Sequence, residues 1–255
     1  MKEVRQFLFL LGFSLVFNSN VTGQDSINKP SLFIGGGSLP EYMLVEFCKL
    51  IGPEAKLVVI PTATGLEVNE DRIRNRWLAR GVQKVDVLHT RDREVASSDG
   101  FADPLKTATA VWISGGSQQR IADAYLNTPV EAELYNLIAR GGIIGGSSAG
   151  AAIQSKVMIS GGRAEPHLET GFDLLENAII DQHFLKRNRW SRLINAIRAN
   201  PKLVGFGIDE DTAIVIQGNQ YQVVGDSYVM RVQMVDGKIQ IDAFENGDTF
   251  TSTND

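Results

Sequence analysis

Ser148 stands in a sequence context that is typical of a catalytic nucleophile. Residues 145–150 read GGSSAG, which fits G-x-S-x-G with Ser148 at the centre, and they follow the apolar run 142–144. A strand that turns sharply into a helix needs tiny neighbours and leaves the central hydroxyl clear of the backbone. The turn also aims the Ala149 amide at the place where an attacked carbonyl would carry its negative charge. The alternative is a glycine-rich loop with an incidental serine.

Two further glycine-rich turns are expected beside Ser148. Residues 113–118 read ISGGSQ and end another apolar run, so they should meet Ser148 at the carboxyl edge of a parallel sheet. Their glycine amides could be the second oxyanion donor, worth about 3–4 kcal/mol to the transition state, although a plain turn is the alternative. Residues 35–37 (GGG) are not a dinucleotide fingerprint, because Pro40 replaces the third glycine. They predict a close backbone approach to the pocket.

A serine nucleophile needs a neutral imidazole to take its proton, and the chain has three histidines. His89 ends a strand and His167 lies in a polar loop, and we interpret both as having no catalytic role. His183 directly follows Asp181 and Gln182 at the end of an apolar strand. Polar groups at a strand end favour a site, so His183 is the candidate base.

Basic side chains follow His183 in the sequence, namely Arg187, Arg189 and Arg192. The last two are three residues apart on one face of a predicted helix whose start is capped by Asn188. Cations at a helix N-terminus oppose the macrodipole and therefore need an anion. A substrate carboxylate, gripped by the guanidinium fork, would supply it; a solvated helix face is the alternative.

Three carboxylates, residues 209–211 (DED), follow the predicted strand 205–208. One of them could hold the imidazole in its tautomer, unless they are surface charges at a turn. No metal-binding spacing is present in the sequence, so we predict neither a catalytic metal nor a cofactor.

The elements that would position these residues alternate between strands and helices from Ser31 onward, which predicts an α/β fold with a mostly parallel sheet covered on both faces. The predicted strands of this part are Leu32 to Ile34, Leu57 to Ile60, Val85 to Leu88, Ala110 to Ile113, Ile143 to Ile144 and Ala178 to Ile180. The predicted helices are Leu39 to Leu50, Asn69 to Arg80, Gln118 to Asn127, Val130 to Arg140 and Asn188 to Ala199. The C-terminal strands, Thr212 to Ile216, Tyr221 to Val224, Tyr228 to Val235 and Lys238 to Ile241, are expected to extend the same sheet in antiparallel fashion.

Composition narrows the class of protein. The 255 residues are 43% hydrophobic and carry a net charge of −5, which makes a nucleic-acid binder improbable. Residues 1–23 combine early cations, a short apolar core and small residues, which predicts a signal peptide and export to the periplasm or the medium. Residues 24–255 are then a single domain, with no membrane span. Cys48 is expected in the core, and oligomeric state, including a homodimer, is left open.

Together the motifs at residues 35–37, 114–118, 147–150, 181–192 and 207–213 resemble the cyanophycinase branch of the S51 serine peptidases. The resemblance implies a three-layer αβα sandwich related to class I glutamine amidotransferase domains. The catalytic serine, histidine and glutamate of the family would be Ser148, His183 and Glu210, with Gly116 and Ala149 as oxyanion donors. The residues that would contact substrate are Gln118, Asp181, Gln182, Arg187, Arg189 and Arg192.

The activity implied by the resemblance is exopeptidase cleavage of cyanophycin, a polyaspartate with arginine on each side-chain carboxyl, into β-aspartyl-arginine dipeptides through an acyl-enzyme. Two alternatives stay open. One is an aspartyl or isoaspartyl dipeptidase of the same fold. The other is a binding module that recognises acidic peptides without turnover.

Overall fold

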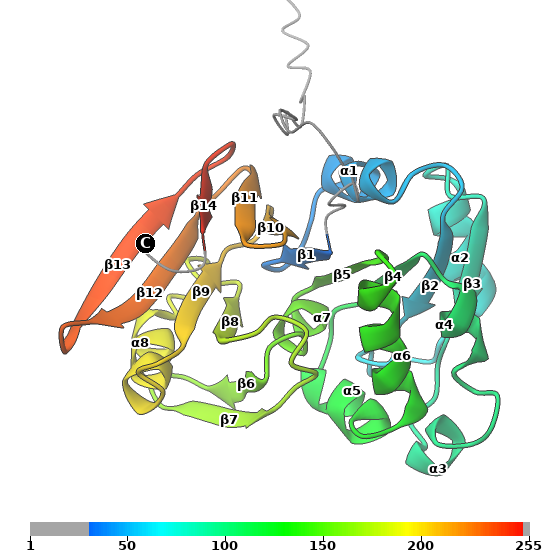
Figure 1. The fold of residues 1–255 in the computed structure, drawn as a ribbon, viewed down its shortest axis with the longest axis horizontal. Helices are drawn as coiled ribbons and strands as arrows, with labels where there is room; N and C mark the ends of the chain where they lie inside the picture. The colour runs from blue at the N-terminus through cyan, green and yellow to red at the C-terminus, as the bar shows by residue number, and fades with distance from the viewer. Residues whose placement is uncertain (1–30, 252–255) are drawn as a thin grey trace, which may run out of the picture.

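A computed structural model describes residues 31–251. It contains an eight-stranded sheet, a four-stranded sheet and a two-stranded hairpin (Figure 1). The large sheet has the order β14-β11-β10-β1-β5-β4-β2-β3. Its strands are β1 (Leu32–Gly35), β2 (Lys56–Ile60), β3 (Lys84–Val87), β4 (Ala110–Ile113), β5 (Ile143–Ser147), β10 (Thr212–Gln217), β11 (Gln220–Gly225) and β14 (Thr249–Thr251).

Five strands of the large sheet, β1 to β5, are mutually parallel, and β10 joins β1 in antiparallel register. The parallel register sets Gly35 opposite Ser147 and Ile113 opposite Gly146. The carboxyl ends of β1, β5 and β4 therefore stop side by side, and the turns that follow them share one edge of the sheet. This is the edge where the glycine-rich turns were predicted to meet.

Helices cover both faces of the large sheet, because successive strand side chains point to opposite faces. On one face Phe33 and Trp112 pack against Phe47 and Trp77, with the Phe47 and Trp112 ring centroids 4.9 Å apart. The helices of this face are α1 (Glu41–Ile51) and α2 (Glu70–Leu78). The helices on the other face are α4 (Asp103–Thr107), α5 (Gln118–Tyr125), α6 (Pro129–Ala139) and α7 (Ala149–Ala152), and α3 (Arg93–Ala96) flanks α5. The αβα sandwich is confirmed.

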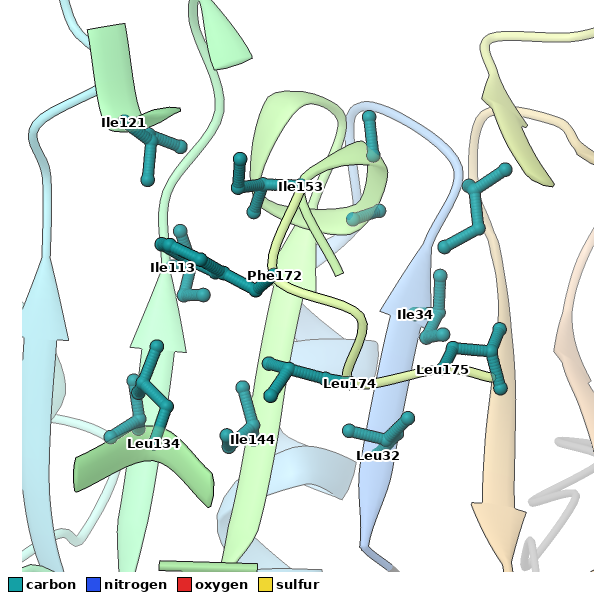
Figure 2. Packing of buried hydrophobic residues seen from close by; sticks show 14 of the residues in the cluster. Leu32, Ile34, Ile113, Ile121, Leu134, Ile144, Ile153, Phe172, Leu174 and Leu175 are labelled. Atoms are coloured by element: carbon teal, nitrogen blue, oxygen red, sulfur yellow. The ribbon is translucent and has the colours of Figure 1, made fainter. Parts of the chain in front are cut away.

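The second face is completed by the segment 171–175, which crosses β5 and β1 (Figure 2). Phe172, Leu174 and Leu175 lie there against Ile34 and Ile144, and Phe172 is fully buried. Burying a side chain of this size stabilises the fold by about 1.5–3 kcal/mol relative to leaving it exposed. The apolar layer holds the strand ends beneath α7 in fixed positions.

The four-stranded sheet has the order β13-β12-β9-β8, with α8 (Trp190–Ala199) packed on one face. Its strands are β8 (Ala178–Gln182), β9 (Val204–Ile208), β12 (Val229–Val235) and β13 (Lys238–Phe244). Phe206 of β9 stacks on Tyr221 of β11, with ring centroids 5.5 Å apart, so the two sheets share one apolar core. The hairpin of β6 (Val157–Gly162) and β7 (Pro166–Thr170) lies beside α5 and α8 (Figure 1).

The second sheet corrects part of the sequence prediction. The strands β8, β12 and β13 were expected in one continuous sheet, but they form a separate sheet with β9, in which β8 and β12 pair with β9 and β13 pairs with β12. Only β10, β11 and β14 extend the large sheet. The chain leaves that sheet at the turn after Gly225, which has a φ of +123°. No helix among residues 31–251 has the length and apolar character needed to cross a bilayer, and residues 1–23 lie outside the described part.

Candidate active site

Ser148 lies on a sharp turn between β5 and α7. Its φ of +53° and ψ of −111° are sparsely populated by residues with a side chain, at a typical cost of about 1–3 kcal/mol. The Ser148 amide donates to the Gly35 carbonyl at 3.0 Å, which anchors the turn to β1. A Cβ on Gly150 would stand 2.0 Å from the Ile113 carbonyl oxygen, so α7 rests directly on the end of β4. The small residues of the motif are therefore needed for packing.

The turn after β4 lies beside Ser148, as the sequence predicted. A Cβ built on Gly115 would be 3.4 Å from the Ser148 Cβ. Gly116 follows with a φ of +144°, which favours glycine, and its α-carbon faces the Ala63 carbonyl. Within residues 31–251, no backbone carbonyl is hydrogen-bonded to the amide of Ala149 or of Gly116. Neither amide is therefore committed to a backbone partner, although Ala149 itself is buried.

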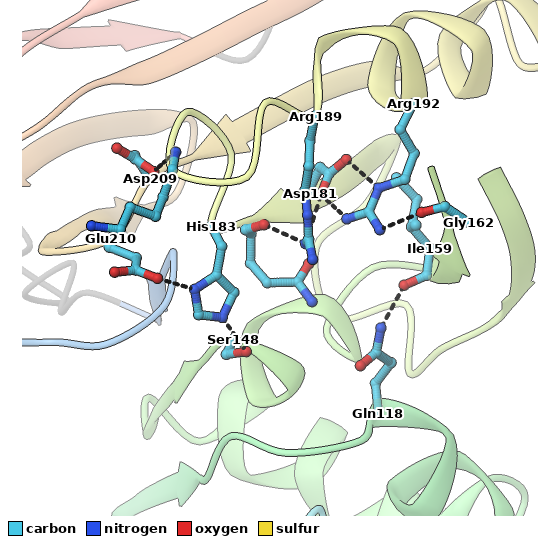
Figure 3. A network of polar contacts seen from close by, with 12 residues as sticks. Gln118, Ser148, Ile159, Gly162, Asp181, His183, Arg189, Arg192, Asp209 and Glu210 are labelled. Atoms are coloured by element: carbon cyan, nitrogen blue, oxygen red, sulfur yellow. Dashed lines mark hydrogen bonds and ion pairs between the residues drawn. The ribbon is translucent and has the colours of Figure 1, made fainter. Parts of the chain in front are cut away.

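The structure brings Ser148, His183 and Glu210 into one hydrogen-bonded line (Figure 3). The Ser148 Oγ is 2.8 Å from His183 Nε2, and His183 Nδ1 is 2.7 Å from Glu210 Oε1. His183 follows β8 and Glu210 follows β9, and these strands pair in parallel with Gln182 opposite Ile208. Parallel pairing explains how two residues 27 positions apart reach the same place.

Backbone contacts fix the His183 ring between the two sheets. His183 has a φ of +52°, and its amide donates to the Gly36 carbonyl. Gly37 lies against the ring, since a Cβ there would be 2.5 Å from His183 Nδ1. Asp209 braces the loop after His183 by accepting the Lys186 amide at 2.9 Å. The imidazole is therefore held on the side of Ser148 that faces β1.

Burial is the main influence on the His183 titration. It lowers the pKa of His183 below the usual 6.5, and the positive charges of Arg187 and Arg189 act in the same direction. The hydrogen bond and charge of Glu210 oppose this by raising the pKa. The net lowering leaves the imidazole neutral at pH 7, so that Nε2 can accept a proton from Ser148 when Nδ1–H donates to Glu210.

The arginine cluster is built differently from the sequence prediction. Asp181 is fully buried and supplies the anion for both Arg192 and Arg189. The Arg192 Nε donates to Asp181 Oδ2 at 2.9 Å, and Arg192 itself is only 5% exposed. A substrate carboxylate is therefore not the partner that Arg192 requires, and Asp181 has no surface to offer a substrate. Burying opposite charges together avoids the cost of an isolated buried charge.

The start of α8 also differs from the prediction. The helix begins at Trp190 with Arg189 at the cap position, and no side chain caps it. Asn188 lies one residue further out, with a φ of +49°. The Arg189 side chain instead turns back to donate to the Gln182 carbonyl at 2.5 Å, which places it between the helix and the His183 strand. Arg187 is exposed.

The two glutamines that were predicted to contact substrate, Gln118 and Gln182, are both nearly buried. Gln118 is 8% exposed, and its Nε2 donates to the Ile159 carbonyl at 2.6 Å (Figure 3). Gln182 is 5% exposed, and its Oε1 is buried without a hydrogen-bond partner. An unsatisfied buried carbonyl next to His183 is an acceptor that a bound ligand could use. The roles of these residues toward substrate stay predictions.

The remaining histidines and the cysteine lie away from the Ser148 line. His89 Nδ1 is 3.0 Å from Thr62 Oγ1, and His167 is exposed on β7 rather than in a loop. Burial raises the pKa of the Cys48 thiol to about 11, so Cys48 stays protonated and unreactive at neutral pH. Among the described residues no group of three or more His, Cys, Asp or Glu side chains is arranged to hold a metal ion.

Sequence reasoning missed two residues that shape the site, Gly37 and Asp209. The notable signal for Gly37 was the run of three glycines at 35–37, which predicted a close approach without saying to what. Asp209 was one of three adjacent acids, and only the structure shows that its carboxylate accepts the Lys186 amide and the Ser227 hydroxyl.

Comparison with known proteins gives concordant matches. The family model of peptidase family S51 matches residues 32–224. The cyanophycinase of Geminocystis herdmanii is 32% identical over 197 residues, covering 73% of this chain and 71% of that protein. The cyanophycinase of Thermosynechococcus vestitus is 34% identical over 215 residues, covering 79% and 67%.

Solved structures agree with the sequence relatives. A peptidase from an acI-B1 actinobacterium superposes with a TM-score of 0.67 at 28% identity, covering 87% of this chain and 96% of that one. A putative peptidase E protein from Listeria monocytogenes has a TM-score of 0.54 at 17% identity, covering 78% and 99%, and it shares the fold.

Proposed function

This chain belongs to peptidase family S51 and is a peptidase, and from that premise we propose that Ser148, His183 and Glu210 are its catalytic triad. The observation that carries the proposal is the unbroken line of two hydrogen bonds, 2.8 and 2.7 Å long, from the Ser148 hydroxyl to the Glu210 carboxylate. Such a line supplies a nucleophile, a base and a group that orients the base.

In the first half of the reaction the His183 Nε2 takes the hydroxyl proton while Ser148 Oγ attacks a peptide carbonyl. The oxygen of the tetrahedral intermediate then accepts from the Ala149 and Gly116 amides. Protonated His183 gives its proton to the leaving amine, and the C–N bond breaks to leave an acyl-enzyme. In the second half, His183 deprotonates water, which attacks the ester and restores Ser148. Glu210 stabilises the imidazolium throughout by accepting from Nδ1.

The substrate that fits best is a peptide polymer of the cyanophycin type, whose arginine branches each end in a carboxylate, released as β-aspartyl-arginine dipeptides from its carboxyl end. The relatives that share about a third of the sequence are named cyanophycinases. The exposed Arg187 and the partly exposed Arg189 next to His183 can receive substrate carboxylates, and the buried Gln182 Oε1 lacks a hydrogen-bond donor that a substrate group could supply.

The deciding experiment is product analysis on cyanophycin with the wild-type protein and Ser148→Ala. We expect wild-type protein to release β-aspartyl-arginine and the variant to lose at least about 10⁴-fold in kcat, because no other group can form the acyl-enzyme. A fluorophosphonate probe should label the wild-type protein and not the variant. Product release by Ser148→Ala at the wild-type rate would refute the triad.

A second candidate is an aspartyl or isoaspartyl dipeptidase of the same fold. Turnover of Asp-Xaa dipeptides without release of β-aspartyl-arginine from cyanophycin would select it. A third candidate is a module that binds acidic peptides without turnover. The aligned hydrogen bonds of Ser148 and His183 speak against it, because binding alone does not need a hydroxyl on a costly turn.

We further propose that the protein is exported and that residues 1–23 are removed. Support comes from the charged start, the short apolar core and the small residues before position 24. N-terminal sequencing of the protein recovered from the periplasm or medium of producing cells should begin near Gln24. Recovery only in the cytoplasm, with residue 1 intact, would refute export.

A further inference from the structure

A second group of arginines lies on the side of Ser148 that faces away from His183. His183 contacts the turn after β1, whereas Gly115 and Gly116 continue from Ser148 toward β4 and β2. A Cβ on Gly116 would be 2.2 Å from the Ala63 carbonyl oxygen, so the loop after β2 begins where the predicted oxyanion turn ends. Arg91 and Arg120 both reach this loop.

Arg91 and Arg120 come from different elements and converge on residues 63–66. Arg91 NH2 donates to the Thr64 and Leu66 carbonyls at 2.6 and 2.9 Å, and Arg120 NH1 donates to the Ala63 carbonyl at 3.0 Å. Two guanidinium groups offer ten N–H donors, and within residues 31–251 the structure assigns these two side chains only three hydrogen bonds. Most of their donors are free for a ligand.

Arg91 and Arg120 carry positive charges that no acidic side chain within residues 31–251 pairs with. Neither forms an ion pair with an acidic group in the described residues. Four carboxylates lie nearby in the sequence, but none of them pairs with Arg91 or Arg120 among the same residues. Glu70 pairs with Arg74 at 3.9 Å, Asp92 accepts the Glu94 amide, Asp123 accepts from Gln119, and Glu67 makes no ion pair. Both arginines are exposed, so the pair presents two positive charges to solvent at the rim of the site.

The loop that Arg91 and Arg120 contact, residues 63–66, is anchored by the buried residue Thr62, which precedes it. Thr62 is fully buried, and its hydroxyl oxygen lies 2.7 Å from the Tyr125 hydroxyl and 3.0 Å from His89 Nδ1. The backbone of residue 64 is held as well, since its amide donates to the Pro61 carbonyl at 3.0 Å. A loop fixed in this way costs little ordering entropy when a ligand binds to it.

We propose that Arg91 and Arg120 form a subsite for the carboxylates of the part of a substrate polymer that extends from Ser148 toward β2. The loop after β2 lies two strand spacings from the end of β5, or about 10 Å. An extended peptide covers that distance in about three residues. A chain of four or more residues therefore reaches the Arg91 and Arg120 subsite while its scissile carbonyl lies at Ser148, and a dipeptide does not.

This inference deepens the proposed function and rests on it for the carboxylates of the substrate, which in a cyanophycin-type polymer stand on the arginine branches. It adds a length preference, because a polymer meets arginines on both sides of Ser148. Arg187 and Arg189 contact the end of the polymer that lies near His183. Arg91 and Arg120 contact the residues of the polymer that lie farther from His183.

The test measures binding separately from turnover. In a Ser148→Ala background, the dissociation constants of fluorescein-labelled octa-aspartate and di-aspartate are measured by anisotropy at one fixed salt concentration. We expect R120Q and R91Q each to weaken octa-aspartate binding about tenfold, the effect of losing one charge-assisted contact. The loss for di-aspartate should be much smaller. R120K, which keeps the charge, should retain most of the affinity.

The matched control is R93Q. Arg93 is also exposed and also donates to two carbonyls, those of Asp123 and Leu126, but on another segment. It should leave both dissociation constants unchanged. Equal weakening by R93Q and R120Q, or equal weakening of both peptides by R120Q, would overturn the subsite. Failure of the proposed function is recognised independently, as absence of wild-type hydrolysis in the product analysis.

Discussion

The Gly37→Ala substitution tests whether the separation of His183 and Glu210 governs catalysis. An alanine Cβ at position 37 would stand 2.5 Å from His183 Nδ1 and 2.8 Å from Glu210 Cγ. Non-bonded carbon contacts prefer about 3.5–4.0 Å, so the ring or the carboxylate must shift by about 1 Å. A misplacement of that size can cost about 100-fold in rate. We expect kcat for peptide hydrolysis to fall by that order.

The assay combines steady-state kinetics with the rate of fluorophosphonate labelling and the thermal midpoint. Labelling should slow in parallel with kcat, because both need His183 to deprotonate Ser148. The acid limb of the pH profile should also move to lower pH, since Glu210 raises the pKa of His183 and its contact would be weakened. A purely structural defect would lower the thermal midpoint without moving that limb.

Gly161→Ala is the matched control, because it also adds a methyl group against a histidine. Its Cβ would lie 3.4 Å from Nδ1 of the exposed His167, close to ordinary contact. We expect wild-type kinetics from this variant. Wild-type kcat and labelling in Gly37→Ala would refute the reasoning, since the hydrogen bond between His183 and Glu210 could then tolerate the displacement.

Three further outcomes are expected. Glu210→Gln should lower kcat by about 10³- to 10⁴-fold with little change in thermal midpoint, because the imidazolium loses its carboxylate; unchanged kcat would contradict this. The value of kcat/KM should rise with pH through an apparent pKa below 6.5, as buried His183 loses its proton. Because the folded pKa is the lower one, His183 also makes stability fall as pH drops from 6.5 through the folded value, and an acid limb above 6.5 would contradict both statements. Asp181→Asn leaves Arg189 and Arg192 without their buried anion and should cost about 3–5 kcal/mol in urea unfolding; a loss under about 1 kcal/mol would show that the pair is solvated.

The sequence predicted the parallel part of the fold well because its signals are local. Strands such as β4 are uninterrupted apolar runs, and the observed bounds Ala110–Ile113 coincide with the predicted ones. The helix α2 begins after Asn69, whose side chain accepts the Arg72 amide at 2.8 Å. Periodicity and capping are read over a few residues, so they need no knowledge of distant partners.

The choice of sheet for β12 and β13 was not predictable from such signals. The two strands are joined by a tight turn, and this hairpin pattern does not indicate which sheet the pair will join. Arg231 of β12 reaches Asp242 of β13 at 2.8 Å, a cross-strand pair that holds the hairpin together and says nothing of its neighbour. The contact that reaches beyond the hairpin joins distant parts of the sequence, since Phe244 of β13 stacks on Phe250 of β14 with ring centroids 4.1 Å apart.

The residues of the site could be predicted from the sequence, but some of the groups that they bond to could not. Ser148, His183 and Glu210 were named from motifs, and the structure brings them together. The pairing of Arg192 with Asp181 was missed because the two residues are 11 positions apart and on different elements. The helix start suggested an absent anion, and sequence spacing cannot show that the preceding strand supplies it.

The hairpin of β6 and β7 connects the helices of the two sheets beside the site. Gln118, on a helix of the large sheet, bonds to Ile159, and Arg192, on the helix of the small sheet, bonds to Gly162 (Figure 3). Residues 159–162 of this hairpin are therefore hydrogen-bonded to a helix of each sheet. A rotation of one sheet relative to the other would have to break one of these two hydrogen bonds.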